Sequence, residues 1–176
     1  MCLTATAKTA LFDSPMVLVV MGVSGCGKST VASALAKALG WNFMEGDAFH
    51  PPENVRRMAQ GIALNDDDRV VWLDSLAKEL THQLQQGQSV VLACSALKKA
   101  YRDVLRRACP DAFFVHLAGT PDLIAQRLAS RKGHYMPPSL LQSQFDTLEP
   151  PTQAELACRY DVSQTPQAIV DDLLIR

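Results

Sequence analysis

The feature that most constrains this chain is a glycine-rich stretch near its amino end, which reads Gly22-Val23-Ser24-Gly25-Cys26-Gly27-Lys28-Ser29-Thr30. It matches the phosphate-binding pattern Gly-x4-Gly-Lys-Ser/Thr at every fixed position. The apolar run at 17–21 before it predicts a buried strand, and the run at 31–39 after it, closed by Gly40, predicts a helix. A strand, a glycine loop and a helix in this order are the context in which the motif binds nucleotide phosphates.

The chemistry of this stretch predicts ATP and Mg²⁺ as ligands. Successive backbone N–H groups of such a loop point inward at a helix N-terminus, where the helix dipole adds positive potential. Lys28 is in position to reach the β- and γ-phosphates, and the Ser29 hydroxyl to ligate Mg²⁺. We therefore expect residues 22–30 to bind the nucleotide, with Lys28 also acting in catalysis.

Length and composition predict one globular domain. Of the 176 residues, we expect 1–15 to form a loosely ordered extension and 16–176 the folded unit. The net charge of −1 offers no attraction for nucleic acid or an anionic membrane, and no apolar run is long enough to span a bilayer. Five cysteines, odd in number and without metal-ligand spacing, fit a reducing, cytoplasmic environment.

Strands and helices alternate along the rest of the chain. We expect strands at 41–45, 89–94, 112–117 and 160–163, with helices between and after them. This alternation predicts an α/β fold, in which a parallel sheet is covered on both faces and ligands bind beyond the carboxyl ends of the strands. That edge would gather the glycine loop, Asp47, Lys98 and Thr165, the last of these on the nucleotide side.

Three absences narrow the class of nucleotide protein. The chain has no Asn-Lys-x-Asp motif to read guanine and no Asp-x-x-Gly switch after a strand. The strand expected at 89–94 is followed by Ser95 rather than by the carboxylate that usually closes a Walker-B strand. The nearest strand-end carboxylate is Asp47, where small-molecule kinases commonly place an acidic residue facing the acceptor.

Five motifs together are more specific than the glycine loop. They are Gly22 to Ser29, Glu45-Gly46-Asp47-x-x-His50-Pro51, Leu64-Asn65-Asp66-Asp67-Asp68-Arg69, Cys94-Ser95-Ala96-Leu97-Lys98-Lys99-x-Tyr101-Arg102-Asp103 and Arg131-Lys132-Gly133-His134. In these motifs the chain resembles the gluconokinases of the short bacterial type, which are related in fold to shikimate and nucleoside monophosphate kinases. The resemblance covers about residues 16–174 and departs from the family at Cys26, where serine is more common.

The resemblance implies transfer of the ATP γ-phosphate to the 6-hydroxyl of D-gluconate. It also implies a P-loop NTPase fold with a five-stranded sheet of order 2-3-1-4-5, a mobile lid at about 131–138, and usually a homodimer. In this family Arg127 would lie near the adenine and ribose, and Arg131 near the γ-phosphate. His134 could join either site, and we expect it on the substrate side.

The acceptor residues follow from the chemistry of an acidic sugar. Asp47 could accept or orient the proton of the attacking hydroxyl, or instead cap a helix. His50 could donate to a hydroxyl or carboxylate, or be a surface histidine. A carboxylate favours an arginine fork. Arg56 and Arg57 compete for that role, and we favour Arg56 and expect Arg57 to pair with Glu53.

Lys98 and Arg102 are four residues apart, so they share a helix face. Lys98 would lie in the first turn of its helix, against the helix dipole, which suggests an anion nearby. We expect the pair to hold the acidic substrate or its transferring phosphate. The alternative is a solvated basic face.

Three other features have simpler interpretations. The run from Asp66 to Asp68 is interpreted as a helix cap rather than a metal site, although one member could touch substrate. Trp72 is interpreted as a packing residue. Cys26, inside an anion nest, is predicted to have a lowered pKa and to react readily with alkylating reagents.

Two other functions fit parts of these observations. One is a kinase for another small hydroxy acid or a nucleotide, although between residues 47 and 61 only Phe49 offers an aromatic ring for stacking a base. The other is a nucleotide-sensing module without catalysis, which would bind ATP and turn over no sugar acid.

Overall fold

The protein is described by a computed structural model that covers residues 14–130 and 140–175. Residues 1–13 of the predicted extension and the predicted lid at 131–138 lie outside the described residues. In the described part, strands and helices alternate as expected. The strands are β1 (Val17–Met21), β2 (Asn42–Glu45), β3 (Val90–Ala93), β4 (Phe113–Ala118) and β5 (Ala157–Asp161).

The helices connect these strands in chain order. They are α2 (Lys28–Leu39), the 3-10 helix η1 (Gly46–Phe49), α3 (Pro52–Ala59), α4 (Asp66–Gln85), α5 (Lys99–Ala108), α6 (Pro121–Ser130), α7 (Leu141–Thr147) and α8 (Pro166–Ile175). None of the described helices is both long and apolar enough to cross a bilayer.

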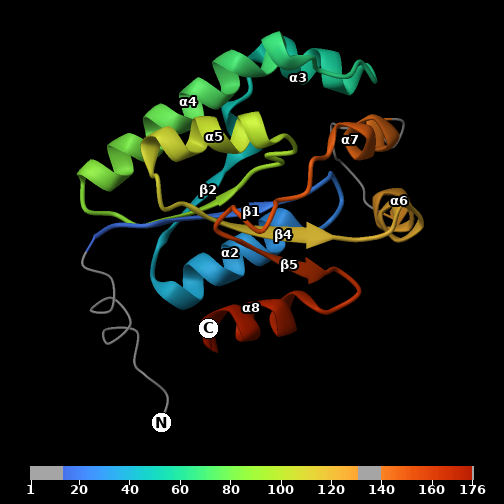
Figure 1. The fold of residues 1–176 in the computed structure, drawn as a ribbon. Coiled ribbons are helices and arrows are strands. Elements are labelled where there is room, and N and C mark those ends of the chain that lie inside the picture. The colour runs from blue at the N-terminus through green and yellow to red at the C-terminus, as the bar shows by residue number, and fades with distance from the viewer. Residues whose placement is uncertain (1–13, 131–139, 176) are drawn as a thin grey trace.

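The five strands form one parallel sheet in the order β2-β3-β1-β4-β5, which confirms the predicted topology. Each strand is joined to the next strand in the chain by a helical crossover, and helices lie on both faces of the sheet (Figure 1). Helices α4 and α5 cover one face of the sheet, and α2 and α8 cover the other (Figure 1).

Each face of the sheet has its own apolar core. Side chains of α2 and α8, among them Leu35 and Ile169, pack on one face. Trp72, Leu76 and Leu105 of α4 and α5 pack on the other. The central strands are buried on both faces, which is why they read as continuous apolar runs in the sequence.

Strand β5 differs most from its predicted bounds. It begins at Ala157, three residues earlier than the expected 160–163, and pairs with β4 from Phe114 to Ala118. Its sequence, Ala-Cys-Arg-Tyr-Asp, lacks the apolar run of the central strands because it lies at the edge of the sheet. Backbone pairing with β4, rather than side-chain pattern, defines this strand.

Candidate active site

A cavity of about 450 Å³ lies at the carboxyl edge of the sheet. The glycine loop that follows β1 forms one wall, and residues beyond the ends of β2, β3 and β5 also line the cavity. These include Asp47, Ser95 and Val162. The sheet therefore brings together, as the sequence predicts, segments that are far apart in the chain.

The glycine loop is pressed tightly against its surroundings. Gly22 has a φ of 140°, and a Cβ there would lie 2.6 Å from the carbonyl oxygen of Leu117. Gly25 has a φ of 82°, and a Cβ there would lie 2.6 Å from Cγ of Leu128. Because only glycine tolerates both conditions, these two positions set the path of the loop around the cavity.

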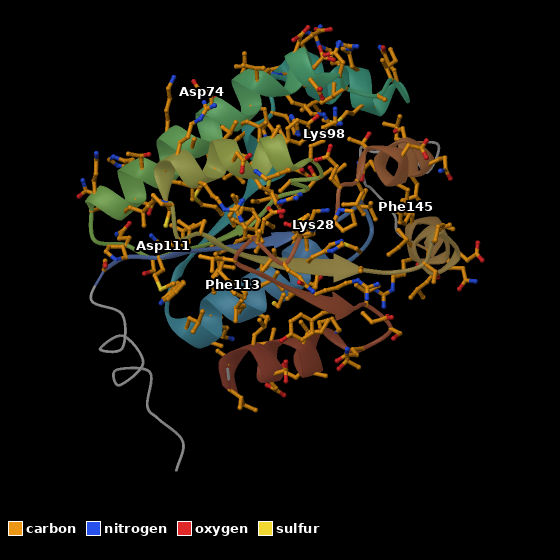
Figure 2. The ribbon with its side chains drawn as sticks, in the orientation of Figure 1. Lys28, Asp74, Lys98, Asp111, Phe113 and Phe145 are labelled. Carbon is orange, nitrogen blue, oxygen red and sulfur yellow. The ribbon has the colours of Figure 1, made fainter. Side chains whose placement is uncertain are left out.

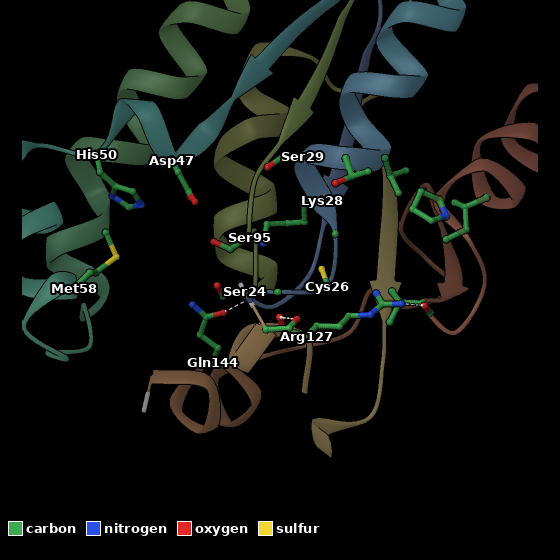
Figure 3. Close-up of a pocket in the computed structure, with 18 of the residues that line it drawn as sticks. Ser24, Cys26, Lys28, Ser29, Asp47, His50, Met58, Ser95, Arg127 and Gln144 are labelled. Atoms are coloured by element: carbon green, nitrogen blue, oxygen red, sulfur yellow. Dashed lines mark hydrogen bonds between the residues drawn. The ribbon is translucent and has the colours of Figure 1, made fainter. Parts of the chain in front are cut away.

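Lys28 lies inside this loop at the start of α2. Its Nζ donates a hydrogen bond to the carbonyl of Val23 at 3.1 Å, so the side chain folds back over the loop (Figure 3). Ser29 follows it and also lines the cavity. An ammonium group, a hydroxyl and a helix N-terminus thus converge here, which is the donor set that a nucleotide triphosphate with Mg²⁺ requires.

The nucleotide side of the cavity also contains Arg127. This residue of α6 lines the cavity, and its Nη2 donates to the carbonyl of Val162 at 2.6 Å. Thr165 is not among the residues that line the cavity, and its hydroxyl accepts a hydrogen bond from the N–H of Ala168 at 3.2 Å and caps α8. Its neighbours Gln164 and Pro166 line the cavity instead.

Asp47 and His50 lie on the opposite wall. Asp47 belongs to η1, directly after β2, and His50 ends that short helix. Both line the cavity, across from Lys28 (Figure 3). Burial lowers the pKa of His50 to about 4, with the positive charge of Arg69 adding to the effect and Asp47 opposing it. The imidazole is therefore neutral at neutral pH.

Arg69 is a cation that the sequence interpretation did not single out. It lines the same wall, and its Nη2 donates to the carbonyl of Leu64 at 3.2 Å. Its guanidinium carbon lies 5.5 Å from the ring centroid of Tyr101, at cation–π distance. Helical spacing could have found it, because Arg69 precedes the buried Trp72 by three residues and so shares its face of α4.

Gln144 of α7 is a second residue that was not predicted. Its Oε1 accepts a hydrogen bond of 2.6 Å from the backbone N–H of Ser24 in the glycine loop (Figure 3). Both residues are buried and line the cavity. The two lie 120 positions apart, so no local sequence signal could join them.

The structure corrects the prediction for Arg102. This side chain is fully buried, and its guanidinium is occupied by protein oxygens. It pairs with Glu155 and donates to the backbone carbonyls of Ala96 and Glu149. The positive charge of Arg102 is therefore used in an ion pair inside the protein and is not available, with Lys98, to bind a ligand.

Lys98 lies away from the main cavity. It is the N-cap of α5, and its Nζ bonds both carboxylate oxygens of Asp66 at 2.8 Å. Figure 2 shows Lys98 in the layer of α4 and α5, apart from Lys28. The anion inferred from its placement at the start of a helix is therefore a carboxylate of the protein itself.

The arginines of α3 are paired in the opposite way to the prediction. Arg56 pairs with Glu53 at 2.6 Å, and both side chains are more than 60% exposed. Arg57 pairs with Asp68 at 2.5 Å. Neither arginine lines the cavity. Among the described residues, Arg69 is the arginine that lies beside His50 in the cavity and could bind a carboxylate in their place.

The acidic run is a helix cap, as interpreted. Asn65 is the N-cap of α4, and its side chain and that of Asp68 exchange hydrogen bonds with each other's backbone N–H groups, at 2.8 and 2.9 Å. Asp66 has a second role, because it accepts hydrogen bonds from both Lys98 and Tyr101. Within residues 14–130 and 140–175, no group of three metal-ligating side chains is found.

The prediction of a lowered pKa for Cys26 is wrong, although the residue lines the cavity. Its side chain is 2% exposed, and burial raises the pKa of the thiol, although Lys28 pulls in the other direction. The sulfur lies close to Gly22, where an added Cβ would meet it at 2.9 Å. Two predicted site residues, Arg131 and His134, lie outside the described residues.

The phosphate loop lies at the carboxyl edge of a parallel sheet and faces a polar wall of Asp47, His50 and Arg69, which we call the acceptor wall. This arrangement defines a P-loop kinase. A family model described as an AAA domain matches residues 17–151. At the level of individual relatives, the chain belongs to the gluconokinase family.

Three comparisons support this membership. The chain is 47% identical to the gluconokinase of Gluconobacter oxydans, covering 95% of this chain and 94% of that protein. It is 46% identical to a probable gluconokinase of Xenopus tropicalis, covering 90% of this chain and 91% of that protein. The crystal structure of a gluconokinase from Sinorhizobium meliloti matches with a TM-score of 0.81 and 48% identity, covering 92% of this chain and 90% of that one.

Proposed function

We propose that this protein transfers the γ-phosphate of ATP to the 6-hydroxyl of D-gluconate by in-line displacement. The observation that carries the proposal is the pairing of two walls in one cavity. A phosphate loop with Lys28 forms one wall, and Asp47, His50 and Arg69 form the other. Membership in the gluconokinase family supports the choice of acceptor.

Each polar group then has a role in the transfer. Lys28 and the loop N–H groups neutralise charge on the phosphates, and Asp47 aligns the attacking hydroxyl and accepts its proton. Ser29 would hold Mg²⁺, which neutralises further phosphate charge when bound. Arg127 would lie along the nucleotide, and Arg131 and His134 are proposed to complete the site.

The acceptor wall suits an acidic polyol. Arg69 offers planar donors for the carboxylate, and neutral His50 can donate to or accept from a hydroxyl group, according to its tautomer. The ring of Tyr101 contacts the guanidinium of Arg69, and the Tyr101 hydroxyl donates a hydrogen bond to Asp66. Phosphoryl transfer depends chiefly on positioning and charge neutralisation, and this wall supplies the positioning.

We extend the proposal to a homodimer, which the family resemblance implies. Its catalytic unit would be a single domain at 16–176, as the length of the chain indicates, and its cysteines fit a cytoplasmic location. Light scattering on the purified protein would test the assembly. A mass of one chain at micromolar concentration would contradict the dimer and leave the catalytic proposal unaffected.

An acceptor panel tests the activity. Purified protein with ATP and Mg²⁺ is offered D-gluconate, its epimers, shikimate and nucleoside monophosphates, and ADP release is followed by a coupled assay. We expect turnover with D-gluconate and little with the other acceptors. ATP binding without turnover of any acceptor would instead favour a nucleotide-sensing module.

A further inference from the structure

Trp72 of α4 holds the turn that carries Asp47. The indole is fully buried, and its Nε1 donates to the carbonyl of Gly46 at 2.8 Å. Gly46 has no spare room on its other side, because a Cβ there would lie 2.5 Å from the carbonyl oxygen of Ala93. The backbone just before Asp47 is thus held between the end of β3 and the indole of Trp72.

The same indole also holds His50. The two rings are stacked, with centroids 4.2 Å apart and planes 15° apart. The Nδ1 of His50 is buried and has no hydrogen-bond partner in the part of the chain that the structure describes. Stacking against Trp72, rather than a described hydrogen bond at Nδ1, therefore orients the imidazole at the cavity wall.

The element that carries Asp47 and His50 has little rigidity of its own. Helix η1 is four residues long, Gly46–Phe49, and a single 3-10 turn has few internal hydrogen bonds. Helix α4 is 20 residues long, capped at Asn65 and packed along the sheet. A rigid helix thus supports a short turn through one side chain.

We propose that Trp72 is a positioning residue for the acceptor, which sets the place of Asp47 through the Gly46 carbonyl and the ring plane of His50 through stacking. This inference rests on the proposed function and deepens it. It assigns a role in substrate selection to a residue whose burial alone is typical of core packing. The kinetic constants for D-gluconate should therefore depend on Trp72, and the KM for ATP should not.

Trp72→Phe separates the two contacts, because it keeps an aromatic face for His50 and removes the N–H that binds Gly46. We expect the KM for D-gluconate to rise and kcat to fall, by about tenfold together, which is the scale of one lost hydrogen bond. The KM for ATP should stay within about twofold. The matched control is Leu80→Ala, which opens the same core on the same helix, away from the turn. It should lower Tm and leave both KM values unchanged.

A second measurement does not depend on activity. Histidine NMR titration, with His50→Asn to assign the signal, should give a pKa near 4 for His50 in the wild type and in Trp72→Phe. In Trp72→Leu the ring loses its cover, and the pKa of His50 should rise towards the ordinary value of about 6.5.

Two results would overturn the inference. One is a Trp72→Phe enzyme with lowered Tm and wild-type constants for D-gluconate, which would make the residue purely structural. The other is an unchanged His50 titration in Trp72→Leu. If the wild type does not phosphorylate D-gluconate, the proposed function fails, and the titration still decides whether Trp72 orients His50.

Discussion

Arg102 on α5 and Glu155, which precedes β5, form a two-point ion pair inside the protein. The Nε–Oε2 distance is 2.7 Å and the Nη2–Oε1 distance is 2.9 Å, and both side chains are less than 5% exposed. The guanidinium lowers the pKa of Glu155 to about 2. The pair joins α5 to the segment that leads into the edge strand, so this arginine serves the fold.

Arg102→Ala should therefore destabilise the protein strongly. Removal of Arg102 breaks the two-point pair and leaves the buried Glu155 with Arg106, at 3.1 Å, as its remaining described counter-charge. Because breaking a buried pair costs about 3–5 kcal/mol, we expect a loss near the lower end of that range. Urea unfolding followed by circular dichroism would measure the loss. Arg56→Ala, which breaks an exposed pair, is the control and should cost less than about 0.5 kcal/mol. Equal losses in the two variants would contradict this account.

Lys28→Ala should lower kcat by roughly 10²–10³, the range observed when one preorganised charge-stabilising donor is lost. Lysine contributes a point charge at the phosphates, which alanine cannot replace. The coupled ADP-release assay measures the effect. Lys37→Ala, at the other end of the same helix, should retain the wild-type rate. A Lys28→Ala enzyme at near wild-type rate would remove this residue from the mechanism.

Arg69→Gln should raise the KM for D-gluconate by about 10- to 100-fold, because a hydrogen bond to a charged group contributes about 1.5–3 kcal/mol. The KM for ATP should change little, since Arg69 lies on the acceptor wall, beside His50. Initial-rate kinetics with each substrate varied in turn would show the split. Arg56→Gln is the matched control, and a larger effect from Arg56 than from Arg69 would restore the sequence-based preference.

His116 on β4 should make the fold sensitive to acid. It is buried, neither ring nitrogen has a hydrogen-bond partner among the described residues, and burial lowers its pKa to about 4, with Arg159 and Arg102 adding to the effect. In the unfolded chain the His116 imidazole takes up a proton near pH 6.5, while in the folded chain it stays neutral down to about pH 4. Stability is therefore lost as pH falls through that window.

Protonation of His116 alone changes the free energy of unfolding by at most about 1.4 kcal/mol per pH unit. His116→Leu should flatten the stability profile between pH 6.5 and 4, measured by urea unfolding at each pH. His50 titrates in both proteins, so its contribution cancels in the comparison. Parallel profiles for the variant and the wild type would show that His116 is not the cause.

Cys26 should resist alkylation in the folded protein, contrary to what its place in the glycine loop suggests. Its thiol is buried with a raised pKa, so both access and thiolate fraction are low. Maleimide labelling at pH 7.5, followed by peptide mass spectrometry, should modify the partly exposed Cys158 before Cys26. Rapid labelling of Cys26 that ATP prevents would support the opposite view.

The fold was largely predictable, because the signals for it are local. Apolar runs, the glycine loop and the helix ends at Gly40 and Gly87 each report on a few neighbouring residues. The predicted start of strand β5 was three residues too late, because an edge strand is defined by backbone pairing and its side chains show a weaker apolar pattern.

The site was predictable only in part. Lys28, Ser29, Asp47, His50 and Arg127 line one cavity, as expected for residues beyond strand ends. Arg102, Lys98 and Arg56 do not, because each is neutralised by a carboxylate of the protein itself. Sequence shows which residues are charged, but the distribution of a limited set of counter-charges depends on contacts between distant segments.

The sequence by itself determined the phosphate loop, the alternation of strands and helices and the class of kinase, since each rests on short-range spacing and backbone preference. Only the tertiary structure decided that Arg69 lines the cavity, that the thiol of Cys26 is buried with a raised pKa and that the indole of Trp72 contacts Gly46 and His50. Those outcomes depend on burial and on contacts between distant segments, such as those of α4 with β3 and with η1. Desolvation and long-range contacts, which no local pattern encodes, decide which charged side chains pair inside the protein and which line the cavity.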